Sequence, residues 1–334
     1  MLSGLKNQLM ALVCVTGGNG FIASWLIKRL LERGYTVRAT VRDPGNLRKI
    51  AHLQNLPHAS ERLELVKADL LNEGSFDTAV EGCEGVFHVA SPVNFVPDNP
   101  EEDLIIPAIE GTLNVLNACA KSNCLKRVVL TSSMAAVSTQ TLAKSGFIVD
   151  ESCWSDPDYC KERNRWYALS KLLAEQRAWE FAKEKGLDLV VLNPGFIAGR
   201  PLQDSLDVAT EEVLNFLTGQ DSLTKDSAFA WVGVKDVVEA HILALEVPMA
   251  SGRYICAEQV MDAPTLLQVL QKIIPGHAVP PKYVANPLPP ATLYKVSTEK
   301  LKKLGLTLGP IEDALKETVD YLLGKGLLPK EIQT

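Results

Sequence analysis

The 334-residue sequence lacks the features of several protein classes. Its apolar stretches, such as 11–15 and 189–192, are far shorter than the ~20 residues that a membrane-spanning helix needs. Lysine and arginine are scattered, and the formal net charge of -6 offers no attraction toward nucleic acid or an anionic membrane. The sequence therefore favours a small-molecule partner and predicts neither a nucleic-acid nor a membrane partner.

The cysteine and histidine patterns argue against two further kinds of site. The seven cysteines are odd in number, widely spaced and without a Cys-x-x-Cys pair, which argues against a disulfide framework or a zinc site. The five histidines show no ligand spacing, so we expect no metal. Cys153 and Cys160 could still pair under oxidation, because they flank one short segment.

The composition, with 46% hydrophobic and 22% charged residues, is that of a globular chain with one large core and a smaller lobe. The first ten residues contain no basic region followed by an apolar region and a cleavage site. We therefore expect a cytoplasmic protein, as a monomer or a homodimer.

Short β-rich runs alternate with amphipathic segments through the first two-thirds of the chain, which is typical of a parallel sheet covered on both faces. Strands are predicted at 11–16, 36–42, 63–67, 85–89, 127–131 and 188–192. Helices are predicted at 21–33, 47–55, 76–80, 104–122 and 163–185. Gly34 and Gly186 are expected to end helices. This pattern predicts an α/β fold with a doubly wound Rossmann sheet.

The regular alternation stops after Asn193, and prolines crowd the stretch 275–290. We expect a Rossmann domain over 1–193 and a smaller, mostly helical substrate-binding lobe over 194–334. Within the second part, 253–257 is predicted to return to the main sheet as a strand. Helices of the lobe are predicted at 210–218, 237–245, 265–274 and 311–323.

Segment 13–23 is an apolar strand that runs into a glycine-containing turn and then into a helix. Gly17 and Gly20 let the backbone approach a pyrophosphate at the helix N-terminus, and Ala23 is the small residue that helix–strand packing requires. A purely structural turn is the alternative interpretation. The residues predicted to bind a dinucleotide here are Thr16, Gly17, Asn19, Gly20, Phe21 and Ile22.

The end of the second strand distinguishes the two nicotinamide cofactors, because an acid there binds ribose hydroxyls and a cation binds a 2'-phosphate. Arg42 occupies this position, and Lys49 could add a second charge. Two charge-assisted contacts of ~1.5–3 kcal/mol each would favour NADPH by at least about a hundredfold. Asp43 could instead bind the ribose diol. Residues 1–193 are thus expected to bind NADP, and Arg38 is expected to be structural.

Other cofactor contacts are predicted where further strands end. Asp69 could accept a hydrogen bond from the adenine amino group, or it could cap a helix, and both interpretations are open. Small residues after the fourth strand would let the cofactor pass close to the sheet. The remaining predicted contacts are Leu70, Val89, Ala90, Ser91, Thr131, Ser132, Pro194 and Gly195.

Tyr167 and Lys171 lie four residues apart on a predicted helix and therefore share one face. A nearby ammonium is expected to lower the pKa of a tyrosine from its usual ~10. A tyrosine tuned in this way can protonate a carbonyl oxygen. The spacing alone is weak evidence, but its place after a glycine turn and three hydroxyl residues predicts a nucleotide-dependent carbonyl reductase.

The run Thr131-Ser132-Ser133 follows an apolar strand, so its hydroxyls should emerge at the edge of the sheet where ligands bind. Ser133 is the predicted donor to the substrate carbonyl, and Ser132 is the alternative. Lys171 is expected to donate to the nicotinamide ribose as well. The predicted substrate contacts are Ser133, Met134, Trp154, Tyr167, Phe196 and Leu202, although the apolar ones could equally be core residues.

These motifs together resemble the extended short-chain dehydrogenase/reductase family, and within it the plant dihydroflavonol reductase and cinnamoyl-CoA reductase branch. The resemblance covers nearly the whole chain and includes the segments 34–44, 85–92, 150–156 and 250–254. It implies Ser133, Tyr167 and Lys171 as the catalytic triad. It also implies Arg42 and Lys49 as ligands of the 2'-phosphate, with hydride delivered from NADPH to a carbonyl of a phenylpropanoid or flavonoid.

Cinnamoyl-CoA reductases carry Lys-Asn-Trp-Tyr-Cys-Tyr-Gly-Lys where residues 163–171 of this chain read Arg-Asn-Arg-Trp-Tyr-Ala-Leu-Ser-Lys. The segment is more similar to aldehyde and ketone reductases of the same branch, such as phenylacetaldehyde reductases. We therefore expect an NADPH-dependent reductase of an aromatic aldehyde or ketone, with Tyr167 as the proton donor. Reduction of a hydroxycinnamoyl-CoA or a dihydroflavonol is the alternative, and a non-catalytic NADP-sensing protein is a remote one.

Overall fold

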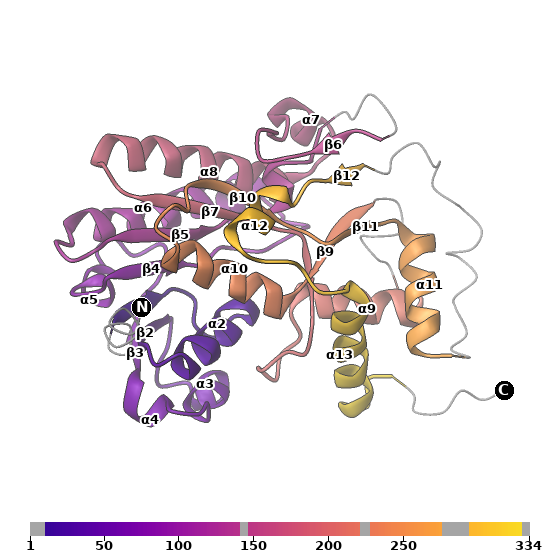
Figure 1. Cartoon of the computed structure of the whole chain (residues 1–334), viewed down its shortest axis with the longest axis horizontal. Coiled ribbons are helices and arrows are strands. Elements are labelled where there is room, and N and C mark those ends of the chain that lie inside the picture. The colour runs from indigo at the N-terminus through magenta and orange to yellow at the C-terminus, as the bar shows by residue number, and fades with distance from the viewer. Residues whose placement is uncertain (1–10, 141–145, 221–227, 276–293, 329–334) are drawn as a thin grey trace.

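The structure is a computed structural model that describes four stretches of the chain, 11–140, 146–220, 228–275 and 294–328. Its centre is a seven-stranded sheet in which all neighbouring strands are parallel (Figure 1). In spatial order the strands are β10 (Gly252–Cys256), β7 (Leu189–Pro194), β5 (Arg127–Thr131), β4 (Gly85–His88), β1 (Leu12–Val15), β2 (Thr36–Val41) and β3 (Leu63–Lys67). The chain order reverses between β1 and β4, where ligands bind in such sheets.

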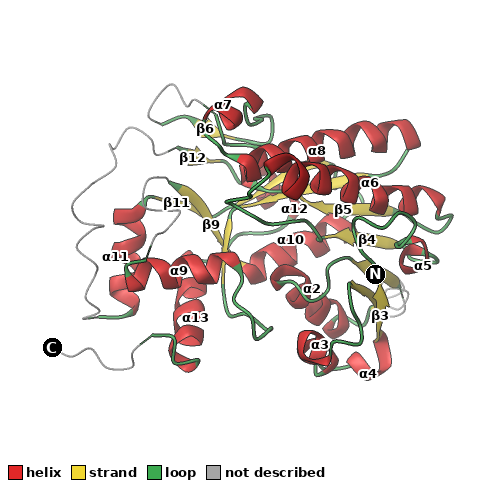
Figure 2. Cartoon of the chain, turned by 180° about the vertical axis from the view of Figure 1, so that it is seen from behind, coloured by secondary structure: helices red, strands yellow, loops and turns green. Residues whose placement is uncertain are grey.

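Helices cover both faces of this sheet, as Figures 1 and 2 show from opposite sides. One apolar core lies between the sheet and the helices α2 (Phe21–Glu32), α3 (Leu47–Gln54) and α10 (Val234–Glu246). A second core lies between the other face and the helices α5 (Asp77–Val80), α6 (Ile106–Lys121) and α8 (Trp166–Lys185). This arrangement confirms the predicted doubly wound fold, and the predicted return strand at 253–257 is β10, which pairs with β7.

The helix that carries the predicted tyrosine begins later than the sequence pattern indicated. Asn164 adopts the left-handed backbone conformation, with φ of 53°, and separates α8 from a short preceding helix, α7 (Pro157–Glu162). Tyr167 therefore lies in the first turn of α8. The helix α6 is also shorter than predicted, because a π-helical turn, η1 (Glu101–Ile105), precedes it.

Three of the four helices predicted for the smaller lobe are α9 (Val208–Thr218), α11 (Ala263–Ile273) and α13 (Ile311–Gly324). The fourth, predicted at 237–245, is α10, which packs on the main sheet and not in a separate lobe. The C-terminal part also contains a sheet that the sequence analysis did not predict, made of β8 (Phe196–Ala198), β9 (Phe229–Gly233) and β11 (Gln259–Met261). These strands have only three to five residues, which is too short for a clear alternation of apolar and polar residues. The sheet and the three helices share a separate apolar core.

The remaining short elements are α4 (Ala59–Arg62), η2 (Met134–Ala136), α12 (Glu299–Leu304), and the paired strands β6 (Ile148–Val149) and β12 (Lys295–Val296). In the part of the chain that the structure describes, no helix combines the length and the apolar character needed to cross a bilayer. The predictions about residues 1–10, and about most of the proline-rich stretch 275–290, lie outside the described residues.

Candidate active site

The glycine-containing turn after β1 is held against the end of β4. Gly17 has a positive φ of 69°, and a Cβ there would lie 3.0 Å from Cβ of Ala90. Gly20 is the N-cap of α2, and the first turn of that helix contains no acidic residue. The partial positive charge of the helix N-terminus is therefore available to an anion. Gly17 is therefore required by the tight packing of the turn against Ala90, next to this helix N-terminus.

Thr16 fixes the position of this turn. Its hydroxyl accepts hydrogen bonds from the backbone N–H groups of Val89, at 3.0 Å, and Ala90, at 2.9 Å. It also hydrogen-bonds to Nδ1 of His88 at 3.0 Å. Burial lowers the pKa of His88 to about 3, so the imidazole is neutral at physiological pH. The turn after β1 and the segment after β4 are thus one connected unit.

Arg42 directly follows β2, and Lys49 lies on α3, and both side chains are exposed. Asp43 uses its carboxylate locally, because Oδ1 accepts a hydrogen bond from the backbone N–H of Gly45 at 3.0 Å. This contact weakens the competing interpretation in which Asp43 binds a ribose diol. Arg38 is structural, as expected, since its guanidinium binds Glu64 at 2.9 Å and backbone carbonyls.

Asp69 and Leu70 follow β3. The Asp69 carboxylate accepts a hydrogen bond from the backbone N–H of Leu71 at 3.0 Å, in a turn rather than at a helix N-cap. Leu70 packs on α6, where a Cβ on Gly111 would lie 2.8 Å from its side chain, and its carbonyl accepts a hydrogen bond from Asn114 at 2.7 Å. The side chain of Asp69 is exposed, and its contact with the adenine stays a prediction.

The structure brings Tyr167, Lys171 and Ser133 together at the ends of β5 and α8. The phenol of Tyr167 and the hydroxyl of Ser133 form a hydrogen bond. The side chain of Lys171 is buried, its Nζ lies 5.9 Å from the centre of the Tyr167 ring, and it donates to the carbonyl of Thr131 at 3.5 Å. The three side chains therefore share one site, although their catalytic roles stay predictions.

The pKa values in this site correct one expectation. The pKa of Tyr167 is raised to about 12 by burial, and the hydrogen bond from Ser133 opposes that rise only in part. The pKa of Tyr167 is therefore raised, and not lowered as predicted, because burial dominates. Burial also lowers the pKa of Lys171 to about 8, against the opposing charge of Glu175. Tyr167 consequently keeps its proton at neutral pH and can act as an acid.

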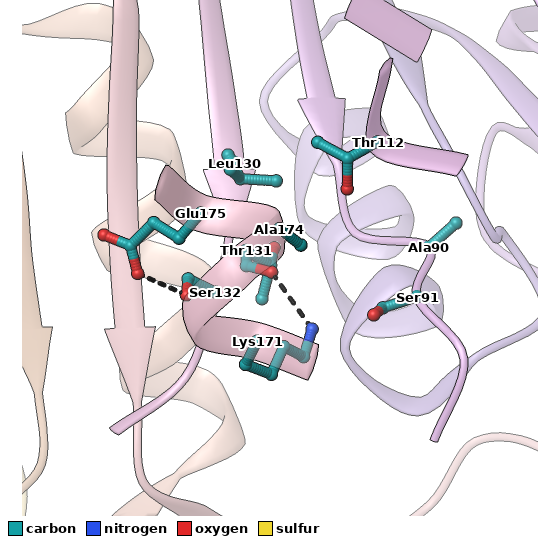
Figure 3. A pocket seen from close by; sticks show the side chains of 9 residues that line it. All are labelled: Ala90, Ser91, Thr112, Leu130, Thr131, Ser132, Lys171, Ala174 and Glu175. Atoms are coloured by element: carbon teal, nitrogen blue, oxygen red, sulfur yellow. Dashed lines mark hydrogen bonds between the residues drawn. The ribbon is translucent and has the colours of Figure 1, made fainter. Parts of the chain in front are cut away.

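The two candidate serines face different partners. Ser133 contacts the phenol of Tyr167 and also caps η2 by accepting from the backbone N–H of Ala135 at 3.1 Å. Ser132 donates to the buried carboxylate of Glu175 (Figure 3). Thr131 hydrogen-bonds through its side chain to His241 at 2.7 Å. Of these three hydroxyls, the one on Ser133 is therefore the one placed beside the predicted proton donor.

A cavity of about 10 Å³ lies beside Lys171, close to the ~10–15 Å³ that one water molecule requires. Figure 3 shows the Lys171 ammonium on one side of it and Ala90 and Ser91 on the other. Its walls are formed by Ala90, Ser91, Thr112, Leu130, Thr131, Ser132, Lys171, Ala174 and Glu175. The predicted cofactor contacts after β4 and β5 thus face each other across the same space.

A row of aromatic rings leads away from Tyr167. Phe95, on the loop after β4, lies with its ring centre 4.6 Å from that of Tyr167 and 6.3 Å from that of Phe196. The Phe196 ring in turn lies 4.7 Å from Phe229 and 5.2 Å from Trp231. Phe196 was predicted as a substrate contact, whereas the other three were not singled out, and Trp231 is fully buried in the core of the C-terminal part. Their segments are distant in sequence, so no local pattern could have identified them.

The remaining predicted substrate residues are less closely connected with Tyr167. Met134 is buried in a small core between η2, β9 and β10. Trp154 stacks on the guanidinium of Arg253 at 3.7 Å, and Leu202 is half-buried on the loop after β8. Gly195, which was predicted as a cofactor contact, is tightly enclosed, because a Cβ there would clash with the carbonyl oxygen of Ala230. It lets the chain pass from β7 into the second sheet.

Cys153 and Cys160 are both free thiols in the structure. The sulfur of Cys153 lies 3.8 Å from Oδ1 of Asp150, and the sulfur of Cys160 lies 3.9 Å from the carbonyl of Thr139. Burial raises the pKa of the Cys160 thiol to about 11, which disfavours its reactive thiolate form.

Comparison with known proteins identifies the family of this site. The model of the "NAD dependent epimerase/dehydratase family" matches residues 13–256. The chain is 48% identical over 321 residues to cinnamoyl-CoA reductase CAD2 of Medicago truncatula, which covers 96% of this chain and 98% of that protein. It is 50% identical over 317 residues to cinnamoyl-CoA reductase 1 of Petunia hybrida, covering 95% of this chain and 93% of that protein.

Solved structures agree with the sequence relatives. Vestitone reductase from alfalfa (Medicago sativa) superimposes with a TM-score of 0.81 at 36% identity, covering 95% of this chain and 99% of that one. Both the family model and the curated relatives span more than half of the chain. The chain therefore belongs to the NAD dependent epimerase/dehydratase family of extended short-chain dehydrogenases/reductases, as its motifs predicted.

Proposed function

We propose that this protein is an NADPH-dependent carbonyl reductase that acts on an aromatic aldehyde or ketone of the phenylpropanoid type. Its family makes it an NAD(P)-dependent oxidoreductase. The observation that carries the substrate proposal is the row of aromatic rings that begins at Tyr167 and continues through Phe95 and Phe196.

The residues at the carboxyl edge of the sheet fit NADPH. The backbone at Gly17 and the N-terminus of α2 suit a pyrophosphate, and the exposed cations Arg42 and Lys49 suit a phosphate on the adenosine ribose. The solved yeast methylglyoxal/isovaleraldehyde reductase Gre2, complexed with NADPH, is similar in structure, with a TM-score of 0.82 at 26% identity over 95% of this chain and all of that one. NADPH when bound supplies the hydride.

The side chains around Tyr167 supply the rest of the chemistry. Ser133 donates a hydrogen bond to the substrate carbonyl oxygen, which polarises the bond and stabilises the developing alkoxide. Tyr167 transfers its proton to that oxygen as the carbonyl carbon receives the hydride, so that the product is an alcohol. Lys171, held beneath the phenol, stabilises the phenolate that remains after proton transfer. The phenolate then regains a proton from solvent.

The aromatic row indicates the kind of substrate. The rings of Phe95 and Phe196 lie next to the proton donor. An aromatic pair contributes ~0.5–1.5 kcal/mol of interaction free energy beyond the burial of its apolar surface. A substrate ring attached to the carbonyl group would continue this row. The reduced group would then lie at Tyr167 and the aromatic ring beside Phe95 and Phe196.

Reduction of a hydroxycinnamoyl-CoA thioester is the second candidate. It is favoured by the identities of 48% and 50% to two proteins named cinnamoyl-CoA reductase. The segment 163–171, which differs from the cinnamoyl-CoA reductase pattern, favours the aldehyde instead. A thioester also needs space for the large CoA group outside the aromatic row.

The test is NADPH oxidation by the purified protein with phenylacetaldehyde, cinnamaldehyde, feruloyl-CoA and dihydroquercetin, each repeated with NADH. We expect turnover of the two aldehydes with NADPH, and a much lower rate with NADH. A preference for feruloyl-CoA would replace the leading proposal by the second candidate. Inactivity with all four compounds would refute both.

A further inference from the structure

The segment that carries both predicted phosphate-binding cations, residues 40–52, is hydrogen-bonded to the glycine-containing turn at its beginning. The backbone N–H of Gly18 donates to the carbonyl of Thr40 at 2.7 Å, and the backbone N–H of Gly17 donates to the hydroxyl of Thr40 at 3.2 Å. Thr40 lies on β2, two residues before Arg42. The start of this segment therefore has a fixed position relative to the turn.

A second contact connects the end of the same segment to the turn. Nε2 of His52, on α3, lies 3.0 Å from the hydroxyl oxygen of Ser24, in the first turn of α2. Ser24 is fully buried, and its hydroxyl donates toward the carbonyl oxygens of Gly20, at 2.7 Å, and Gly18, at 3.2 Å. Because the single hydroxyl proton points to these carbonyls, the imidazole N–H is the donor to Ser24.

His52 is half-buried and is poorly suited to bind a phosphate by itself. Burial lowers the pKa of its imidazole, so the ring is neutral at physiological pH. Its Nε2 is already used by Ser24. Any effect of His52 on a bound nucleotide must therefore pass through the helix that it anchors.

The helix α3 packs beside α2 through contacts of two kinds (Figure 1). Ile50 and Leu53 are buried in the apolar core that α2 also enters. Apolar contacts of this kind stabilise the packing but have no preferred direction. The hydrogen bond between His52 and Ser24 is directional, so it fixes the rotation and the height of α3 relative to the N-terminus of α2.

Lys49 is the residue whose position this contact sets. It precedes His52 by three residues, so the two side chains are neighbours on the helix surface. Its backbone N–H donates to the side chain of Asn46, the N-cap of α3, at 3.3 Å. The Lys49 side chain is exposed and flexible, so its reach is determined by where α3 places its backbone.

We propose that His52 is a positioning residue for the choice of cofactor: its hydrogen bond to Ser24 fixes Lys49 relative to the glycine-containing turn and thereby favours NADPH over NADH. The contacts form a closed ring, from the turn through Thr40 and Arg42 to α3, and back through His52 and Ser24. This inference rests on the proposed function, in which Arg42 and Lys49 bind the 2'-phosphate of NADPH.

The test is the dissociation constant of the full chain for NADPH and for NADH, measured by fluorescence titration without substrate. In His52→Leu we expect the affinity for NADPH to fall about three- to tenfold and that for NADH to change less than about twofold, because NADH has no 2'-phosphate. His52→Gln, whose amide can donate to Ser24, should recover most of the loss. Gln54→Leu, at an exposed position of the same helix, is the matched control and should change neither affinity.

A double-mutant cycle separates positioning from a general loss of stability. Lys49→Ala alone should weaken NADPH binding, and adding His52→Leu should cause little further loss, because the residue through which His52 acts is gone. Additive losses would overturn the inference. Equal losses for NADPH and NADH in a folded His52→Leu variant, or no loss for either, would overturn it as well, because a merely structural contact predicts those results even if the melting temperature falls.

These titrations distinguish the inference from the proposed function, because they do not require turnover. A wild type that reduces no carbonyl compound, together with a selective loss of NADPH affinity in His52→Leu, would refute the proposed reductase and support the positioning role. A wild type that reduces an aromatic aldehyde, together with equal losses for both cofactors in His52→Leu, would refute the positioning role and leave the reductase function supported.

Discussion

The two cationic parts of the site differ in their surroundings. Lys171 is buried, with only 6% of its surface exposed, among Thr131, Glu175 and Tyr167. Arg42 and Lys49, the predicted ligands of the 2'-phosphate, are exposed. A buried charge depends strongly on each neighbour, whereas exposed charges are screened by solvent and salt. The buried part should therefore govern turnover and pH dependence, and the exposed part should govern the choice of cofactor.

The strongest test of this contrast is Tyr167→Phe in the buried part. It removes the proton donor, so we expect kcat to fall by about 10²–10⁴-fold while the affinity for NADPH changes little. Steady-state kinetics and fluorescence titration with NADPH measure the two quantities. Wild-type turnover in this variant would show that another group protonates the alkoxide.

The buried part should also make the fold sensitive to acid. The pKa values of His88 and His241 are lowered to about 3 and about 4, so the unfolded state binds more protons than the folded state below about pH 6.5. The stability that these neutral histidines contribute is complete above pH 6.5 and is lost progressively as the pH falls toward 3. Between pH 7 and pH 5 we expect the free energy of unfolding to fall by on the order of 2 kcal/mol per histidine.

Urea unfolding at the two pH values measures this loss. His88→Asn keeps a polar partner for Thr16 and should remove about half of the pH dependence. His58→Asn is the control, because His58 is exposed and its positive φ of 65° suits asparagine. Equal pH dependence in His88→Asn and the wild type would mean that other groups cause the acid sensitivity.

In the exposed part, Arg42→Ala should act on affinity and not on the chemical step. We expect NADPH to bind about tenfold more weakly, NADH to be little affected, and kcat at saturating NADPH to be unchanged. Raising the salt concentration should narrow the difference between wild type and variant. The control is Arg177→Ala on the outer face of α8. An equal loss of affinity for NADPH and for NADH would show that the 2'-phosphate binds elsewhere.

The smallest effect is expected from Phe95→Ala, which removes the ring that covers Tyr167. The ratio of kcat/KM for phenylacetaldehyde to that for an aliphatic aldehyde should fall about 2–10-fold, as expected for the loss of one aromatic contact. Val96→Ala is the matched control, because Val96 is the next residue and is 83% exposed. An unchanged ratio in Phe95→Ala would show that this ring does not contact the substrate.

Several features of the fold were predictable because they depend on residues close together in the chain. The strands β3 and β5 have the predicted bounds, and each contains a short run of leucine and valine residues. The seven strands and their flanking helices follow from the same alternation. The short strands β8, β9 and β11 were not predicted, because three to five residues carry too little periodic signal.

Within the site, Glu175 could have been found from the sequence. It stands four residues after Lys171, the same spacing that made Tyr167 and Lys171 a pair, so it shares their helix face. Its partner Arg253 could not have been found in this way, because 78 residues separate the two. Phe95 and Trp231, the aromatic neighbours of Phe196, lie on segments that are distant in sequence, so they could not have been found in this way either.

The sequence by itself determined the sheet, the glycine turn and the Tyr167–Lys171 spacing, because each arises from neighbouring residues and a regular backbone period. Only the tertiary structure decided that Ser133 rather than Ser132 contacts the tyrosine, and that burial raises the pKa of Tyr167. The physical reason is that desolvation and hydrogen-bond geometry depend on which distant segments pack around a group. Local periodicity contains no information about that packing.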